Sequence, residues 1–130
     1  MLLARAIHWQ GRRHPMAGAL PFEVEVCAQP QGHGYTELRV DAENAFFPLG
    51  TILRGHEFHY SAILPGTCLP RTACEVRRGV GCGGARDGVV RGNVWASYTH
   101  LHALATPAWA AGMLQAARRF AFRGTSASPC

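Results

Sequence analysis

The sequence predicts an α/β fold whose sheet places polar side chains at the end of a buried strand. Residues 89–96 are apolar enough for a strand covered on both faces, as in an α/β sheet. Residues 22–29 and 35–40 alternate apolar and polar side chains with a period of two, which is typical of half-buried strands. Residues 108–122 repeat apolar side chains at helical spacing. These segments together supply the strands and the helix of such a fold.

Length and composition indicate one globular domain. The chain has 130 residues, of which 48% are apolar and 16% charged, as in proteins with a hydrophobic core. No apolar run approaches the roughly 20 residues that a membrane-spanning helix needs. At the N-terminus the basic residues follow the short apolar run, which is the reverse of a secretory signal. We therefore expect a cytoplasmic protein with no membrane partner.

The positive charge comes entirely from arginine. The formal net charge is +5, and all 13 basic residues are arginines. A guanidinium group binds carboxylates and phosphates with two parallel hydrogen bonds, so the composition suits an anionic substrate. A coding bias toward arginine and alanine explains it more simply. Because the arginines are scattered and not interleaved with aromatic residues, we expect no nucleic-acid partner.

The five cysteines predict free thiols. They stand at positions 27, 68, 74, 82 and 130, an odd number without the C-x-x-C spacing of zinc sites. A disulfide framework is not expected in a cytosolic chain. Cys82 lies in a glycine-rich stretch, residues 79–88, but no predicted helix follows on which a nucleophilic thiol could be mounted. We interpret the stretch as a hairpin between two strands instead of a phosphate-binding loop.

The first half of the chain is expected to contribute a helix and a pair of strands. Residues 1–9 are predicted to form a short helix, and residues 15–20 a short strand. The alternating strands at residues 22–29 and 35–40 are expected to be antiparallel neighbours across a glycine-rich turn. Residues 41–50 are predicted to form a loop with its two phenylalanines tucked beneath it.

Residues 51–64 concentrate reactive side chains on a predicted strand. Alternation places Arg54 and His56 on one face, and Glu57 and His59 on the other. Glu57 and His59 are thus same-side neighbours, and the carboxylate is expected to fix the tautomer of the imidazole and raise its basicity. The histidines of the H-E-F-H run are three residues apart and not four as in a helical zinc site, so no metal is expected.

The second half of the chain is predicted to end in a helix. Residues 72–78 are expected to form a short exposed strand. Thr106 and Pro107 are suited to cap and begin the helix at residues 108–122, and the glycine after it is suited to end it. Residues 124–130 are expected to be a disordered tail.

A polar cluster follows the strand predicted at residues 89–96. It consists of Ser97, Tyr98, Thr99, His100 and His102. Ligands of open α/β sheets bind beyond the carboxyl ends of strands, and residues i and i+2 of an extended segment point the same way. His100 and His102 could therefore serve one site. A pair of hydrogen-bonded histidines explains the pattern equally well, and the residues alone leave both interpretations open.

Several motifs in order resemble one family. RGHEFHYS at residues 54–61 and RGNVWASYTHLH at 91–102 resemble the glutamine amidotransferase domain of cobyrinic acid a,c-diamide synthases. GRRHPMAGALP at residues 11–21, PQGHGY at 30–35 and HALATPAWA at 102–110 continue the resemblance. The resemblance extends over residues 1–123. It is strongest to the branch proposed to amidate sirohaem-like tetrapyrroles in sulfur-metabolising bacteria.

The resemblance implies the C-terminal portion of a class I glutamine amidotransferase, a flavodoxin-like open sheet with antiparallel additions. In the family a cysteine thiolate attacks the glutamine amide, and ammonia passes to a synthetase domain that uses ATP and Mg²⁺ to activate carboxylates of an anionic tetrapyrrole. His100 matches the histidine that activates the cysteine. This portion itself is expected to hold no cofactor. The remaining matched residues, expected to contact substrate or to support His100, are Arg54, His56, Glu57, His59, Tyr98 and His102.

The resemblance also implies that the nucleophile is missing. The family's cysteine lies in a Cys-Gly-Gly-Leu-Met turn, and residues 1–3 are similar to those directly after it. We therefore expect a gene fragment, a misassigned start, or half of a split enzyme whose partner chain carries the turn. Because the histidine only activates a thiol, these residues alone are expected to be inactive. The alternative is a non-catalytic module that binds a tetrapyrrole or a metal through His56, His59, His100 and His102.

Overall fold

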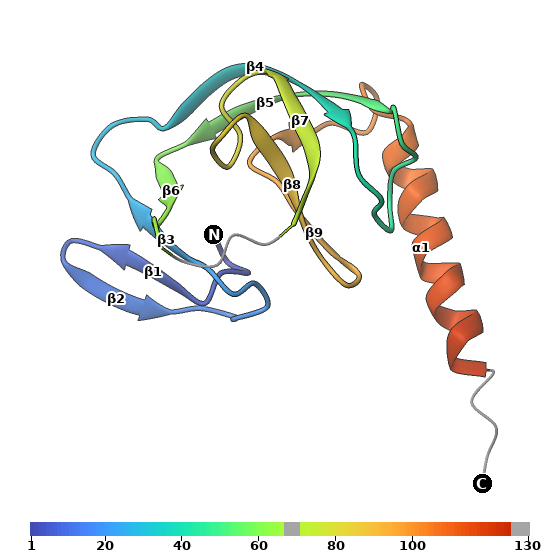
Figure 1. Cartoon of the computed structure of the whole chain (residues 1–130), viewed down its shortest axis with the longest axis horizontal. Helices are drawn as coiled ribbons and strands as arrows, with labels where there is room; N and C mark the ends of the chain where they lie inside the picture. Colours follow the sequence, from blue (N-terminus) through green and yellow to red (C-terminus); the bar gives the residue numbers. More distant parts are fainter. Residues whose placement is uncertain (67–70, 126–130) are drawn as a thin grey trace, which may run out of the picture.

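The chain folds into two β-sheets and one helix in the computed structural model, which describes residues 1–66 and 71–125 (Figure 1). The smaller sheet has the order β2-β1-β3-β6 and the larger one the order β10-β5-β4-β7-β8-β9. Strand β1 pairs with β3 in parallel, and the other pairs are antiparallel. The expected combination of sheet and helix is confirmed, with strands dominating. The elements are β1 (Ala6–Trp9), β2 (Arg12–Pro15), β3 (Glu23–Val26), β4 (Gly32–Val40), β5 (Ile52–His59), β6 (Ser61–Ile63), β7 (Thr72–Arg78), β8 (Arg86–Arg91), β9 (Val94–Ala96), β10 (His100–Leu101) and α1 (Ala108–Thr125).

The N-terminal segment is not the helix that its sequence predicts. Residues 6–9 form β1, which turns back into β2 through Gln10 and Gly11, both with positive φ. Two successive residues in this conformation make the tight hairpin turn whose twist matches that of paired strands. Because β1 also pairs with β3, hydrogen bonds to two neighbours override the weak local helical preference. The strand predicted at residues 15–20 is wrong for the same reason, since β2 ends at Pro15.

The two alternating strands, β3 and β4, are real but are not neighbours. Strand β3 lies in the smaller sheet between β1 and β6, whereas β4 lies between β5 and β7 in the larger one. Alternation specifies which face of a strand is buried but not which strand lies beside it. The predicted loop at residues 41–50 is confirmed, and Phe47 is buried beneath it.

Two further predictions fail around strands β7 to β9. Strand β7 is not exposed, because it lies inside the sheet and both Ala73 and Cys74 are completely buried. Residues 89–96 are not one strand, since the chain reverses at Gly92 and Asn93 and β8 pairs with β9. The glycine-rich stretch does connect two strands, β7 and β8, as predicted.

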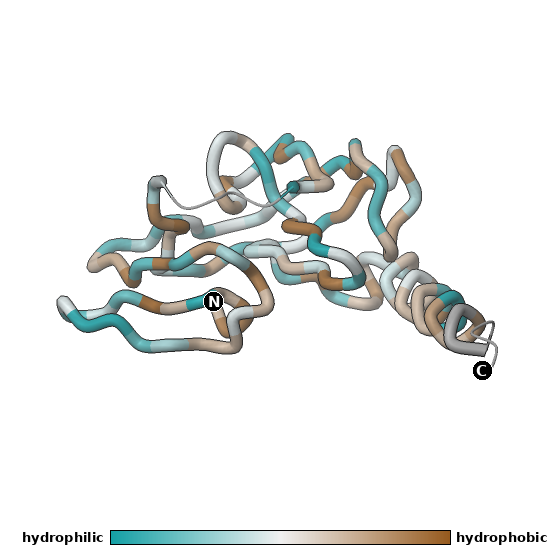
Figure 2. The backbone as a smooth tube through the Cα atoms, turned by 60° about the horizontal axis from the view of Figure 1, so that its bottom comes forward, coloured by the Kyte–Doolittle hydropathy of each residue, from teal (hydrophilic) through white to brown (hydrophobic). Residues whose placement is uncertain are grey.

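Helix α1 projects away from the sheets (Figures 1 and 2). Trp109, Met113 and Phe120, which helical spacing places on one face, are exposed. The Thr106 hydroxyl donates to the Arg54 carbonyl instead of capping the helix, and the helix continues through Gly124. The predicted tail beyond residue 125 and two of the cysteines, at positions 68 and 130, lie outside the described residues.

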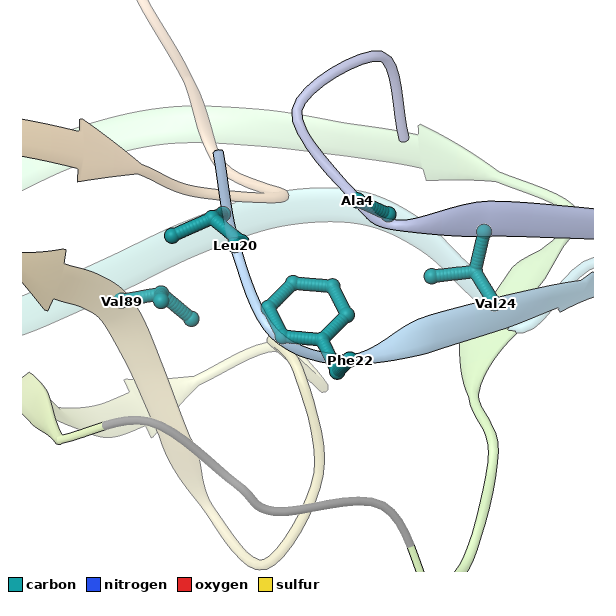
Figure 3. Close-up of a cluster of buried hydrophobic side chains, with 5 residues drawn as sticks. All are labelled: Ala4, Leu20, Phe22, Val24 and Val89. Atoms are coloured by element: carbon teal, nitrogen blue, oxygen red, sulfur yellow. The ribbon is translucent and has the colours of Figure 1, made fainter. Parts of the chain in front are cut away.

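Two buried clusters hold the sheets together. In the first, the Phe22 ring lies between Leu20 and Val24, and Val89 faces it from β8 (Figure 3). Ala4 completes that cluster and ties the N-terminal turn to the larger sheet. The second cluster consists of Leu38, Val40, Phe47, Leu53 and Cys74, with Leu101 and Trp95 packed against it. Leu101 thus anchors β10, the strand that carries His100.

Candidate functional site

His100 lies on the edge strand β10 with its imidazole exposed to solvent. Its backbone is paired with His56 of β5, and Leu101 is paired with Gly55. A Cβ atom on Gly55 would lie 2.2 Å from the His100 carbonyl oxygen, so only glycine allows β10 to pack this closely. The His100 ring stacks on the His56 ring, with 5.1 Å between centroids and 29° between planes.

His102 lies beyond the end of β10 and shapes the turn toward helix α1. Its side chain is exposed, and its Nδ1 atom accepts a hydrogen bond from the Leu104 amide at 3.3 Å. Its carbonyl oxygen accepts from the amides of Ala105 and Thr106. The structure thus gives His102 a local role in the turn, and the His100 stack does not involve it.

A buried polar cluster lies under β5, on the face opposite His56. Glu57 and His59 are 1% and 8% exposed, and His59 Nε2 lies 3.5 Å from Glu57 Oε2, as the alternation of the strand predicts. His59 Nδ1 donates to the Ser61 carbonyl oxygen at 2.9 Å, which fixes a proton on that nitrogen. The Tyr98 ring stacks on His59 at 3.8 Å, and its hydroxyl hydrogen-bonds the Ser61 hydroxyl at 2.9 Å. Burial raises the pKa of Tyr98, so its hydroxyl stays protonated at neutral pH.

Glu57 holds the glycine-rich loop in place. Its carboxylate accepts the Val80 amide at 2.6 Å and the Gly81 amide at 3.0 Å. A Cβ atom on Gly79 would lie 2.9 Å from the same carboxylate, so the loop must be free of side chains here. Gly79 therefore allows the backbone to approach a buried acid closely, a structural use of glycine that does not involve phosphate.

Asp87 is an important residue that the sequence prediction missed. It is completely buried at the start of β8, and its carboxylate accepts from the Ser97 hydroxyl at 2.8 Å. It also accepts from the amides of Tyr98 and Thr99, at 3.2 and 3.1 Å. These bonds fix the turn that delivers His100 to the sheet edge. An acidic residue directly before an apolar run was the available signal, because a buried carboxylate requires donors.

The remaining outer residues of β5 form a surface next to His100. Arg54 pairs with Glu37 of β4 at 3.0 Å, and neither touches the buried cluster. The structure therefore brings His56 and Arg54 to the outer face beside His100, while Glu57, His59 and Tyr98 lie on the inner side. The four histidines named by the sequence do not converge, and no group of three metal-ligating side chains comes together within residues 1–66 and 71–125.

Two cavities join the start of the chain to the segment that carries His100. A cavity of about 450 Å³ is lined by Met1, Leu2 and Leu3 together with Ser97 and Tyr98. A second cavity, of about 780 Å³, lies between the sheet and α1, and Leu3, Thr99 and Leu101 contribute to its wall. Residues 1–3 therefore lie beside the turn that leads into β10.

The cysteines within the described residues are unsuited to act as nucleophiles. Burial raises the pKa of Cys74 to about 12 and that of Cys82 to about 11, so both remain thiols at neutral pH. Cys27 is half-buried at the end of the smaller sheet, where its thiol points toward the Glu25 carbonyl. An exposed imidazole on β10 can act as a general base, yet the two buried thiols stay protonated at neutral pH.

Comparison with known proteins identifies the family. The model of the CobB/CobQ-like glutamine amidotransferase domain matches residues 1–108, which include both histidine motifs. The chain belongs to this family. Cobyrinate a,c-diamide synthase of Magnetococcus marinus is 36% identical over 129 residues, which cover 99% of this chain and 27% of that protein.

Other members of the family match in the same way. The enzyme of the same name from Syntrophotalea carbinolica is 40% identical over 99 residues, which cover 75% of this chain and 22% of the relative. The Salmonella typhimurium protein is 34% identical over 109 residues, with 84% of this chain and 24% of the relative covered. The chain thus spans about a quarter of the length of these relatives. Within the described part of the chain, no helix combines the length and apolar character that crossing a bilayer requires.

Proposed function

We propose that this chain supplies the histidine half of a glutaminase site in an enzyme that amidates a tetrapyrrole or corrinoid carboxylate. The observation that carries the proposal is that His100 is exposed on an edge strand, while residues 1–3 line a cavity with Ser97 and Tyr98 of the turn that precedes it. A general base must be accessible, and a thiol-bearing segment adjoining Met1 would reach the same turn. Family membership supports glutamine as the amide donor.

We propose that the nucleophilic thiol comes from a segment outside these 130 residues. His100 takes the thiol proton, the thiolate attacks the amide carbon of glutamine, and the imidazolium returns the proton to the departing nitrogen, which leaves as ammonia. Water then hydrolyses the thioester to glutamate and regenerates the thiol. Since Cys74 and Cys82 are buried and protonated, we propose that the 130 residues alone do not hydrolyse glutamine.

The destination of the ammonia belongs to the same proposal. The relatives are cobyrinate a,c-diamide synthases, so we assign the chain to a carbon–nitrogen ligase of cobalamin biosynthesis or of sirohaem amidation, in the cytoplasm. ATP and Mg²⁺ would act in a synthetase region outside these residues. A flavodoxin-like open sheet is part of this proposal, and the parallel pairing of β1 with β3 supports it.

A chimera tests the proposed function directly. The part of the Magnetococcus marinus relative that precedes its matched segment is fused to residue 1 of this chain, and release of glutamate from glutamine is measured. We expect glutaminase activity from the chimera and none from the chain alone. His100→Ala in the chimera should lower kcat/KM by about a thousandfold, the size typical of losing a general base.

The matched control is His14→Ala, a substitution of another exposed histidine, on β2 of the smaller sheet. Its activity should equal that of the unaltered chimera. An active chain 1–130 whose rate depends on His100, or a chimera in which His100→Ala changes nothing, would refute the proposed function.

A further inference from the structure

Within the described residues, stacking and not a hydrogen bond sets the orientation of the His100 ring. Among the described residues, the interaction found for this ring is its stack on His56. Both imidazole nitrogens of His100 are therefore left for chemistry. A general base on an exposed edge strand still has to be held in one rotamer. A side chain that rotates freely spends less time in the orientation that reaches the proton donor, which lowers the effective concentration of the base.

Several features of the structure around His56 hold the His100 ring in place. The two histidines are direct cross-strand partners on the outer face, so their side chains are neighbours. Gly55 lets β10 approach to a distance at which a Cβ atom would overlap the His100 carbonyl. Leu101 packs into the second core cluster and prevents β10 from drifting away. Three independent features thus fix the His100 backbone against β5 and place its ring over His56.

We propose that His56 is a positioning residue for His100, whose ring it holds by stacking with both nitrogens left free. The proposal deepens the proposed function and rests on it for the catalytic role of His100. The stack itself is a property of the folded chain and can be tested without activity.

The first experiment measures ring-to-ring contacts of the histidine side chains by NMR in the isolated chain. We expect His56→Phe to keep ring-to-ring contacts with His100, because a flat ring still lies beneath it. His56→Ala should abolish the ring contacts and average the His100 rotamers. The matched control is His33→Phe, on the same face but in edge-to-face contact with Phe58, and it should leave the His100 ring unchanged.

The second experiment measures the glutaminase activity of the chimera at pH 8. His56→Ala should lower kcat/KM about tenfold, and His56→Phe, which restores a flat ring, should retain most of the activity. Ring contacts absent from the unaltered chain, or a His56→Ala chimera as active as the unaltered one, overturn the positioning role. An inactive chimera with intact ring contacts refutes the proposed function while the stack stands.

Discussion

At the scale of single residues, buried acids organise the surroundings of His100. Glu57 ties the glycine-rich loop to β5, and Asp87 ties the turn at residues 97–99 to β8. Each carboxylate accepts backbone amides that would otherwise be buried without a partner. Removal of such an acceptor leaves its donors buried without a partner. The free-energy cost of desolvating those donors exceeds the net stabilisation that the hydrogen bonds provide.

Glu57→Ala is therefore expected to lower the free energy of unfolding by about 2–4 kcal/mol, because it leaves the Val80 and Gly81 amides without their acceptor. The shift in the urea midpoint measures the effect. The matched control is Glu37→Ala, which removes an ion pair whose Arg54 partner is solvent-exposed and should cost less than about 1 kcal/mol. Equal midpoints for the two variants would show that Glu57 is not structurally important.

At the scale of elements, glycines decide how closely β10 and α1 approach their neighbours. Gly55 admits the His100 carbonyl beside β5, and Gly112 admits the Phe46 carbonyl, which lies 2.0 Å from the position of a Cβ atom there. In both places the neighbour is backbone, which cannot rotate away. Strand β10 and the first half of α1 are thus attached through positions where any side chain would push them off.

Gly55→Ala is expected to displace β10 and to cost about 1–3 kcal/mol, the usual range for overpacking. Amide hydrogen exchange of His100 and Leu101 should accelerate about tenfold or more, while that of β7 and β8 stays close to the unaltered chain. Arg54→Ala is the control on the same strand, since it removes a surface side chain without changing backbone approach. Unchanged protection of β10 in the alanine variant would contradict this account of the strand edge.

At the scale of the whole molecule, one cluster of charges ties the smaller sheet together. Glu23 of β3 accepts from Arg13 at 2.9 Å, from His8 at 2.6 Å and from Arg5 at 3.0 Å. The hydrogen bonds from Arg13 and His8 lower the pKa of Glu23 from 4.5 to about 2. Residues from β1, β2 and the N-terminal turn thus meet at one carboxylate, which makes the sheet sensitive to acid.

The sign of that sensitivity follows from the lowered pKa. Stabilisation by Glu23 is fully present above pH 4.5, where the unfolded chain is also ionised, and it is lost as the pH falls toward 2. We expect the Tm advantage of the native chain over Glu23→Gln to be largest above pH 5 and to vanish near pH 2. Thermal melts between pH 2 and 7 measure it. Glu75→Gln, which removes only long ion pairs at 3.8 and 3.9 Å, should show little pH-dependent difference.

The sequence by itself determined the local features of this protein. Alternation along residues 52–59 put Glu57 and His59 on one face and His56 on the other, because successive strand residues point to opposite sides. The order of the motifs identified the family, because each motif is a contiguous run of residues that can be recognised without knowledge of the fold. The hairpin at the glycine-rich stretch was predictable for the same reason.

Only the tertiary structure decided which segments meet. Three features depend on hydrogen bonds between distant parts of the chain. They are the strand conformation of residues 6–9, the separation of β3 from β4, and the pairing of β10 with β5. Local periodicity carries no information about such partners. That pairing brings the His100 ring onto His56 and places Asp87 where it accepts hydrogen bonds from the turn before His100. Such cross-strand contacts form only once the strands are side by side.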